Sequence, residues 1–121
     1  MSTGRKNLGK LGEDLACGYL KKRGYRILAR NFFSRRGEID IVAQEADCLA
    51  FVEVKTRFSD SYGLPEEAVT PKKIESILRT GEFYQFLNPE SPESLRIDVV
   101  AVEFDNDGRL KRMELLKNVT G

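Results

Sequence analysis

The stretch that decides the fold is residues 37–55, which read GEIDIVAQEADCLAFVEVK. Two apolar runs, at 39–43 and 49–55, predict two β-strands, and the polar residues between them predict a turn. If this turn forms a symmetric hairpin, Asp40 lies directly opposite Glu53. The sequence therefore predicts an antiparallel hairpin with two carboxylates facing each other.

A hairpin with Ala46 and Asp47 at its tip also divides the side chains between two faces, because successive residues of a strand point in opposite directions. One face is entirely apolar and holds Ile39, Ile41, Ala43, Ala50, Val52 and Val54. The other face holds Glu38, Asp40, Val42, Phe51, Glu53 and Lys55, with Glu38 opposite Lys55. We expect the first face to be core and the second to carry the chemistry.

The acidic pair is a candidate metal site. Side chains directly opposite each other have Cβ atoms about 4.5–5.5 Å apart, so the two carboxylates would repel by about 3 kcal/mol at an effective dielectric near 20. A divalent cation reverses that repulsion, and Mg²⁺ favours one or two carboxylates together with water and phosphate oxygens. Lys55, on the same face, could orient or help deprotonate an attacking water, or stabilise charge developing on phosphorus.

The alternative interpretation is a solvated ladder of ion pairs on the exposed side of a sheet. In this interpretation the side chains of Glu38, Asp40, Glu53 and Lys55 occupy the same positions of the hairpin but bind no metal. Because Glu-x-Lys on a strand is a short motif that often occurs by chance, spacing alone does not decide between the two interpretations.

A helix is predicted over residues 6–23, where apolar residues recur at helical spacing and Gly24 follows as a stop signal. Glu13 lies at the margin of the apolar stripe of this helix. It could reach over the sheet as a further metal ligand. The alternative is an acidic residue near a helix N-terminus that the helix dipole favours.

The remaining elements predict an α/β or α+β sandwich in one domain, residues 1–121, with a central mixed sheet of about five strands flanked by helices. The first three strands should form an antiparallel meander, and the strand after the second helix should return parallel by a crossover. A connection of about a dozen residues, 58–69, is long enough to be a substrate loop. The other expected elements are a strand at 25–33, a helix opened by Thr70-Pro71 and running to Leu87, and strands at 97–104 and 110–119.

Charge is distributed unevenly along the 121 residues, although the net charge is only +1. Residues 1–36 hold ten Lys or Arg against two acids, whereas residues 37–121 hold ten against seventeen. The N-terminal third is therefore a candidate phosphate-binding surface, and a solvated helix face beside a basic turn is the alternative. The candidate residues for binding nucleic acid are Arg23, Arg26, Arg30, Arg35 and Arg36.

Several classes of function are excluded by composition. There is no histidine, so Ser-His-Asp and Cys-His nucleophile systems are absent, and two cysteines are too few for a disulfide framework or a zinc site. We expect Cys17 and Cys48 to be small buried apolar residues. No apolar run is long enough for a signal peptide or a membrane span, so we expect a soluble cytoplasmic protein with no membrane partner.

Five motifs together resemble the YraN family of small bacterial proteins, over nearly the whole chain. They are GEDLA at 12–16, GEID at 37–40, FVEVKTR at 51–57, AVTPKK at 68–73 and IDVVAV at 97–102. That family is similar to the PD-(D/E)xK, or restriction-endonuclease-like, superfamily, and in layout to archaeal Holliday junction resolvases. The resemblance implies an α/β restriction-endonuclease-like fold.

The resemblance also implies site residues and a cofactor. Asp40, Glu53 and Lys55 match the catalytic positions of the superfamily, Glu13 matches the helical acidic residue of its resolvase-like branch, and Mg²⁺ or Mn²⁺ is the expected cofactor. One departure is that Ile39, rather than proline, precedes Asp40, which leaves the metal ligand in place.

The resulting expectation is a metal-dependent endonuclease that cuts DNA, including branched or otherwise structured forms. Lys72 and Lys73 join the five arginines as expected contacts to nucleic acid. A non-catalytic nucleic-acid-binding or protein-interaction module with the same fold is the competing hypothesis, and RNA stays open as a substrate. The oligomeric state is open too, because the apolar residues Phe83, Tyr84, Phe86 and Leu87 suit either a homodimer interface or a core.

Overall fold

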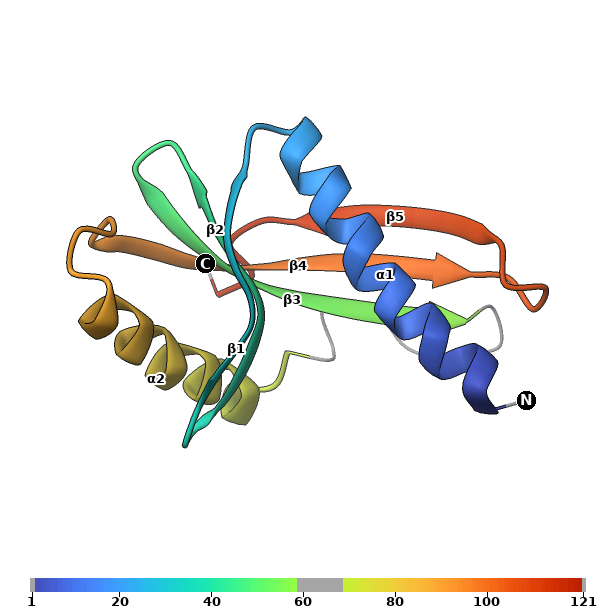
Figure 1. Cartoon of the computed structure of the whole chain (residues 1–121), viewed down its shortest axis with the longest axis horizontal. Helices are drawn as coiled ribbons and strands as arrows, with labels where there is room; N and C mark the ends of the chain where they lie inside the picture. The colour runs from blue at the N-terminus through green and yellow to red at the C-terminus, as the bar shows by residue number, and fades with distance from the viewer. Residues whose placement is uncertain (1, 59–68, 121) are drawn as a thin grey trace.

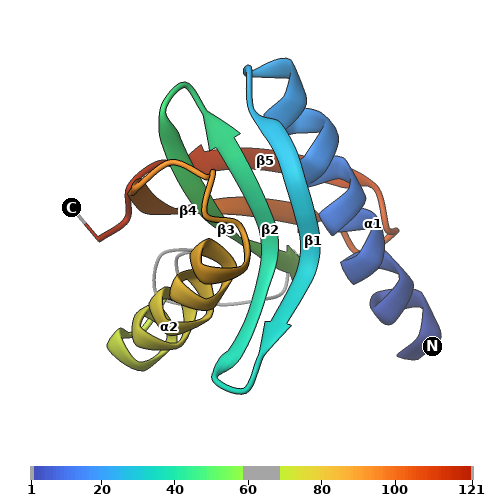
Figure 2. The ribbon, with the colours of Figure 1, turned by 60° about the vertical axis from the view of Figure 1, so that its left-hand side comes forward.

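Two helices pack on opposite faces of a five-stranded mixed sheet (Figures 1 and 2). The computed structural model describes residues 2–58 and 69–120, with side chains from residue 8 onward. The predicted substrate loop falls almost wholly outside these residues. The elements are α1 (Ser2–Lys22), β1 (Arg26–Ser34), β2 (Gly37–Glu45), β3 (Cys48–Phe58), α2 (Pro71–Leu87), β4 (Ser94–Phe104) and β5 (Leu110–Leu116).

The order of the strands in the sheet follows their order in the sequence, β1-β2-β3-β4-β5. Strands β1, β2 and β3 pair antiparallel, β3 and β4 pair parallel, and β4 and β5 pair antiparallel. Helix α2 makes the crossover that a parallel pair requires. The predicted meander and parallel return are confirmed, and this α/β architecture is consistent with the restriction-endonuclease-like fold.

Local sequence signals predicted one end of the helices and strands correctly and two others incorrectly. Helix α2 begins at Pro71, as predicted, with the Thr70 hydroxyl accepting a hydrogen bond from the backbone N–H of Lys73 at 3.2 Å. Helix α1 begins at residue 2 rather than near residue 6. The last strand was predicted to reach Val119 and instead ends at Leu116, because Asn118 turns out of the strand with φ of 52°.

Both faces of the sheet are buried, each under one helix. The core beneath α1 includes Ile41, Val52 and Val100, and the core beneath α2 includes Phe51 and Ile77. Helix α2 approaches so closely that a Cβ at position 81, which is glycine, would overlap the Phe51 ring.

The predicted core face is confirmed from Ile41 to Ala43 and from Ala50 to Val52, but the face expected to carry the chemistry is also core near the turn. Val42 and Phe51 lie on the expected chemical face but are 0% exposed beneath α2. Ile39 belongs to the same core, so regular alternation fails between Ile39 and Ile41. The physical reason is the crossover, since a helix that joins two parallel strands must cover one face of their sheet.

Two further features concern the cysteines and the helices. Cys17 is buried, whereas Cys48 is only half-buried, so the expectation of burial holds for the first alone. Over residues 2–58 and 69–120, neither helix is long and apolar enough to cross a membrane.

Candidate active site where β2 and β3 separate

Strands β2 and β3 pair in the predicted register from the turn as far as Ile41 and Val52, and the pairing ends there. The next residue of β2, Asp40, turns its carboxylate toward β3, where Oδ2 accepts a hydrogen bond from the backbone N–H of Val54 at 2.8 Å. A side chain thus takes the place of a backbone partner. We call the residues around this separation, Glu38, Asp40, Glu53, Lys55 and Lys73, the acidic fork.

Asp40 and Glu53 interact directly within the acidic fork. Burial, hydrogen bonding to the Glu53 carboxyl and the charge of that carboxyl raise the pKa of Asp40 from 3.8 to about 7. The N–H of Val54 and the charge of Lys73 act in the opposite direction and do not compensate. Near neutral pH the pair therefore retains a proton that a divalent cation could replace.

Two lysines stand beside this pair. Lys73, in the first turn of α2, places its Nζ 3.2 Å from Glu53 Oε2, and 40% of its side chain remains exposed. Lys55 lies two residues after Glu53 on β3 and is half-buried. Because alternate residues of β3 face the same core, Lys55 and Glu53 share the face toward α2.

Glu38 is the third acid of the fork, and Glu13 is a fourth acid outside it. The pKa of Glu38 is raised by burial and then by the charges of Asp40 and Glu13. Glu13 itself accepts hydrogen bonds from Arg30 at 3.1 Å and from Asn31 at 2.9 Å. The structure thus brings Glu13 to the border of the fork but turns its carboxylate toward β1.

The metal-binding capacity of the fork rests on a pair of carboxylates. Across residues 8–58 and 69–120, no three side chains of His, Cys, Asp or Glu converge as metal ligands. Asp40 and Glu53 are the pair that could hold Mg²⁺, which binds through one or two carboxylates and otherwise keeps its waters.

The basic residues expected to bind nucleic acid do not form one surface. Arg30 pairs with Glu13 and Asp14, and Arg23 lies over the Tyr19 ring at 3.5 Å. Arg23 and Arg26 lie at the start of β1, and Arg35 and Arg36 follow its end. A strand of nine residues separates these groups by about 26 Å.

At the far end of β1, four cationic side chains gather into what we call the basic patch: Arg35, Arg36, Lys72 and Arg79. The β1–β2 turn is fastened to α2 there, since Ser76 Oγ donates to the backbone carbonyl of Arg36 at 2.6 Å. Ser34 Oγ and Thr80 Oγ1 add a second contact at 2.8 Å. Two pockets of about 230 and 240 Å³ adjoin at this place and share Arg36 and Arg79.

Arg79 was not among the basic residues predicted from the sequence, although its spacing along α2 indicates its place. Lys72, Ser76 and Arg79 are spaced i, i+4 and i+7, which puts them on one side of a helix. That spacing could have added Arg79 to the predicted basic residues.

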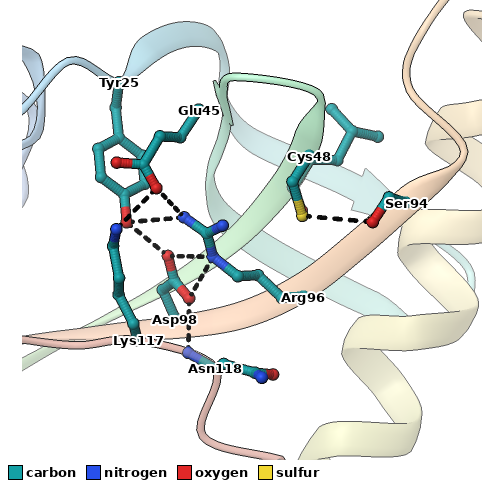
Figure 3. Close-up of polar contacts among 9 residues, drawn as sticks. Tyr25, Glu45, Cys48, Ser94, Arg96, Asp98, Lys117 and Asn118 are labelled. Carbon is teal, nitrogen blue, oxygen red and sulfur yellow. Dashed lines mark hydrogen bonds and ion pairs between the residues drawn. The ribbon is translucent and has the colours of Figure 1, made fainter.

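A second buried polar cluster, which we call the Asp98 network, also escaped sequence analysis (Figure 3). Asp98 is 0% exposed and accepts hydrogen bonds from Tyr25 Oη at 2.8 Å, from Arg96 Nε at 3.0 Å and from the N–H of Asn118 at 2.8 Å. Arg96 in turn donates to Tyr25 at 2.9 Å and to Glu45 at 2.6 Å. Lys117 completes the network, with its Nζ 2.7 Å from Glu45.

The sequence is similar to known proteins over most of its length. The uncharacterised protein family UPF0102 matches residues 12–102, a range that contains all five motifs. A UPF0102 protein of Pelotomaculum thermopropionicum is 42% identical over 118 residues, which is 98% of each chain. One of Syntrophus aciditrophicus is 47% identical over 110 residues, 91% of this chain and 85% of its own. One of Symbiobacterium thermophilum is 45% identical over 113 residues, 93% and 95% of the two chains.

Proposed function

The chain belongs to the UPF0102 family, the YraN family that its motifs indicated, and from the acidic fork we propose that it is a metal-dependent endonuclease acting on DNA. One observation carries the proposal. Asp40 and Glu53 meet where two strands separate, and together with burial this contact raises the pKa of Asp40 to about 7. Strongly perturbed carboxyls of this kind gather at functional sites.

The residues of the fork fit the cation that the proposal requires. Asp40 and Glu53 would hold Mg²⁺ or Mn²⁺, and the charge of the ion would remove the repulsion that now disfavours two ionised carboxylates. When bound, the cation supplies Lewis-acid stabilisation of the phosphoryl group. Arg30 and Asn31 both donate to Oε1 of Glu13, so Glu13 would join it through its other carboxylate oxygen.

The lysines of the fork have separate roles in this proposal. Lys55 shares the face of Glu53, so its ammonium group would orient the attacking water and stabilise negative charge on the phosphoryl oxygens. Lys73 now pairs with Glu53. A cation at Glu53 would release Lys73, and its half-exposed side chain could then bind a phosphate of the DNA backbone.

The test is cleavage of labelled duplex, flap and four-way-junction DNA with Mg²⁺ or Mn²⁺. We expect Asp40→Asn, Glu53→Gln and Lys55→Ala each to lower the cleavage rate at least about 100-fold, the scale for losing one stabilising group in a transition state. Asp47→Asn is the matched control, because it changes an exposed acid of the same hairpin. If the wild-type protein and the three fork variants give the same result on every substrate, the proposal is overturned.

A specific observation favours a second candidate, a non-catalytic nucleic-acid-binding module. The basic patch is fastened to α2 independently of the fork, and Lys73 already neutralises part of the charge of Glu53. Such a module would bind DNA with a strong dependence on salt, and Asp40→Asn would not change that binding. Calorimetric titration of Mn²⁺ separates the two candidates: the nuclease predicts binding by the wild type that Asp40→Asn abolishes, and the module predicts none by either.

A further inference from the structure

We propose that the pocket formed by Ser34, Arg35, Arg36, Arg79 and Phe83 binds an unpaired base together with its phosphate. The inference rests on the proposed function and names its substrate class, which is DNA with a single-stranded segment beside the bond to be cut. Of the two pockets at the basic patch, this is the one that contains an aromatic ring. We call it the aromatic pocket.

The ring of Phe83 is placed to stack on a base. It is 41% exposed on α2, which is high for a large apolar residue that also contacts the interior. Its inner side lies against Phe32, with ring centroids 5.9 Å apart, and Phe32 in turn meets Tyr84 edge-on at 5.2 Å. Phe83 therefore packs on an aromatic cluster of the interior and also lines the aromatic pocket.

The size of the aromatic pocket suits one base. Its volume is about 230 Å³, below the roughly 300–1,000 Å³ of pockets that enclose drug-sized ligands. Inside a duplex both faces of each base are covered by its neighbours, and a terminal base is held in a pair that is larger than this pocket. An unpaired base is free of both constraints and can stack on a protein ring. Selection for single-stranded DNA follows from this geometry.

The charge around the aromatic pocket suits the phosphate of that nucleotide. Arg35, Arg36 and Arg79 line it, and Lys72 lines the adjoining pocket. Two acids oppose them, because Glu82 pairs with Arg79 at 2.9 Å and Glu75 lines the adjoining pocket. Four cations against two carboxylates leave a charge of +2 where a phosphate would bind.

The position of the aromatic pocket relative to the fork sets a distance along the DNA. Arg36 directly precedes β2, and Asp40 follows four residues later, which is about 13 Å along a strand. At about 3.4 Å per nucleotide, this corresponds to roughly four nucleotides of a helical strand. We therefore expect cleavage within about four nucleotides of the unpaired base.

The test compares binding of three probes without divalent metal: oligodeoxythymidine, a blunt duplex, and the same duplex with a single-stranded flap. Phe83→Ala should raise the Kd for oligodeoxythymidine and flap DNA by roughly 5- to 150-fold, the equivalent of about 1–3 kcal/mol for one stacked base. It should leave the Kd for the blunt duplex unchanged. Phe83→Trp should restore tight binding, which shows that a ring, rather than the fold, is what Phe83→Ala removes.

Phe86→Ala is the matched control, because Phe86 lies on the same helix, is 78% exposed and does not line the aromatic pocket. It should not change the Kd for any probe. The inference is overturned if Phe83→Ala affects all three probes equally, if it affects none, or if Phe86→Ala has the same effect.

Cleavage assays keep this inference separate from the proposed function. If the wild type binds oligodeoxythymidine through Phe83 but cuts no DNA with Mg²⁺ or Mn²⁺, the nuclease fails and the aromatic pocket stands. If the wild type cuts flap and blunt DNA equally, and Phe83→Ala cuts both as the wild type does, the nuclease stands and the aromatic pocket fails.

Discussion

Asp40 and Asp98 are both carboxylates on strands of the same sheet, but the fold surrounds them differently. Asp98 is fully buried and receives hydrogen bonds from Tyr25, Arg96 and a backbone N–H (Figure 3). Asp40 receives one backbone hydrogen bond and lies against a second carboxyl, that of Glu53. Lys73 pairs with Glu53 and its charge lowers the pKa of Asp40, but that pKa stays well above its usual value.

The difference separates a carboxylate whose charge is balanced within the fold from one to which we assign a proposed function. The charge of Asp98 is balanced by Arg96 within the fold, so the Asp98 network needs nothing from outside. The acidic fork holds three carboxylates against two lysines, so negative charge is in excess. Such charge destabilises the fold, and proteins accept that cost where a bound ligand supplies the missing positive charge. Substitutions in the two regions should therefore change stability in opposite directions.

The largest effect should come from removing the centre of the Asp98 network. Asp98→Ala removes the buried acceptor of Tyr25, Arg96 and the N–H of Asn118. Arg96 keeps its ion pair with Glu45 but loses its buried partner, so we expect the free energy of unfolding to fall by about 3–5 kcal/mol. Urea denaturation measures the change, with the exposed residue Asp107 changed to Ala as the control. A loss below 1 kcal/mol would show that the network does not hold the fold together.

The acidic fork should show the opposite sign, together with a dependence on pH. In the unfolded chain Asp40 loses its proton near pH 3.8, but in the folded protein it keeps the proton until about pH 7. The folded state binds more protons between these values, so its stability falls as pH rises. Because Asp40 titrates together with the Glu53 carboxyl, we expect a loss on the order of a few kcal/mol over this range.

Asp40→Asn removes this ionisation and can keep an oxygen facing the N–H of Val54. The free energy of unfolding, measured by urea denaturation, should fall less from pH 4.5 to pH 8 in the variant than in the wild type. At pH 8 the variant should be the more stable protein. Asp47→Asn should behave as the wild type does. A variant that is less stable than the wild type at both pH values would mean that Asp40 serves the fold rather than a ligand.

The smallest effect should come from the rim of the Asp98 network. Tyr25→Phe removes a hydroxyl that donates to Asp98 and accepts from Arg96, but Asp98 keeps its bonds to Arg96 and Asn118. We expect a loss of about 2 kcal/mol, within the range for hydrogen bonds to charged groups, in the free energy of unfolding measured by urea denaturation. If Tyr25→Phe lowered the free energy of unfolding as much as Asp98→Ala does, Tyr25 rather than Asp98 would be the residue on which the network depends.

Much of the architecture could be predicted because its signals are local. The Thr70-Pro71 pair predicted the start of α2, and the polar residues at 44–48 predicted the hairpin register as far as Ile41 and Val52. The early end of β5 was not predictable, since it follows from a bond between the N–H of Asn118 and the distant Asp98. Contacts between residues far apart in the sequence leave little trace in local patterns.

The sequence by itself determined the order of the elements, the pairing of the hairpin and the residue types at Glu38, Asp40, Glu53 and Lys55 of the acidic fork. Each of these depends on spacing within about twenty residues, where backbone geometry translates directly into position. Only the tertiary structure decided that α2 buries the face once expected to be open, that Lys73 meets Glu53, and that the basic patch forms at one end of β1. These depend on which helix covers which face of the sheet, and the close packing of side chains sets that only when the whole chain has folded.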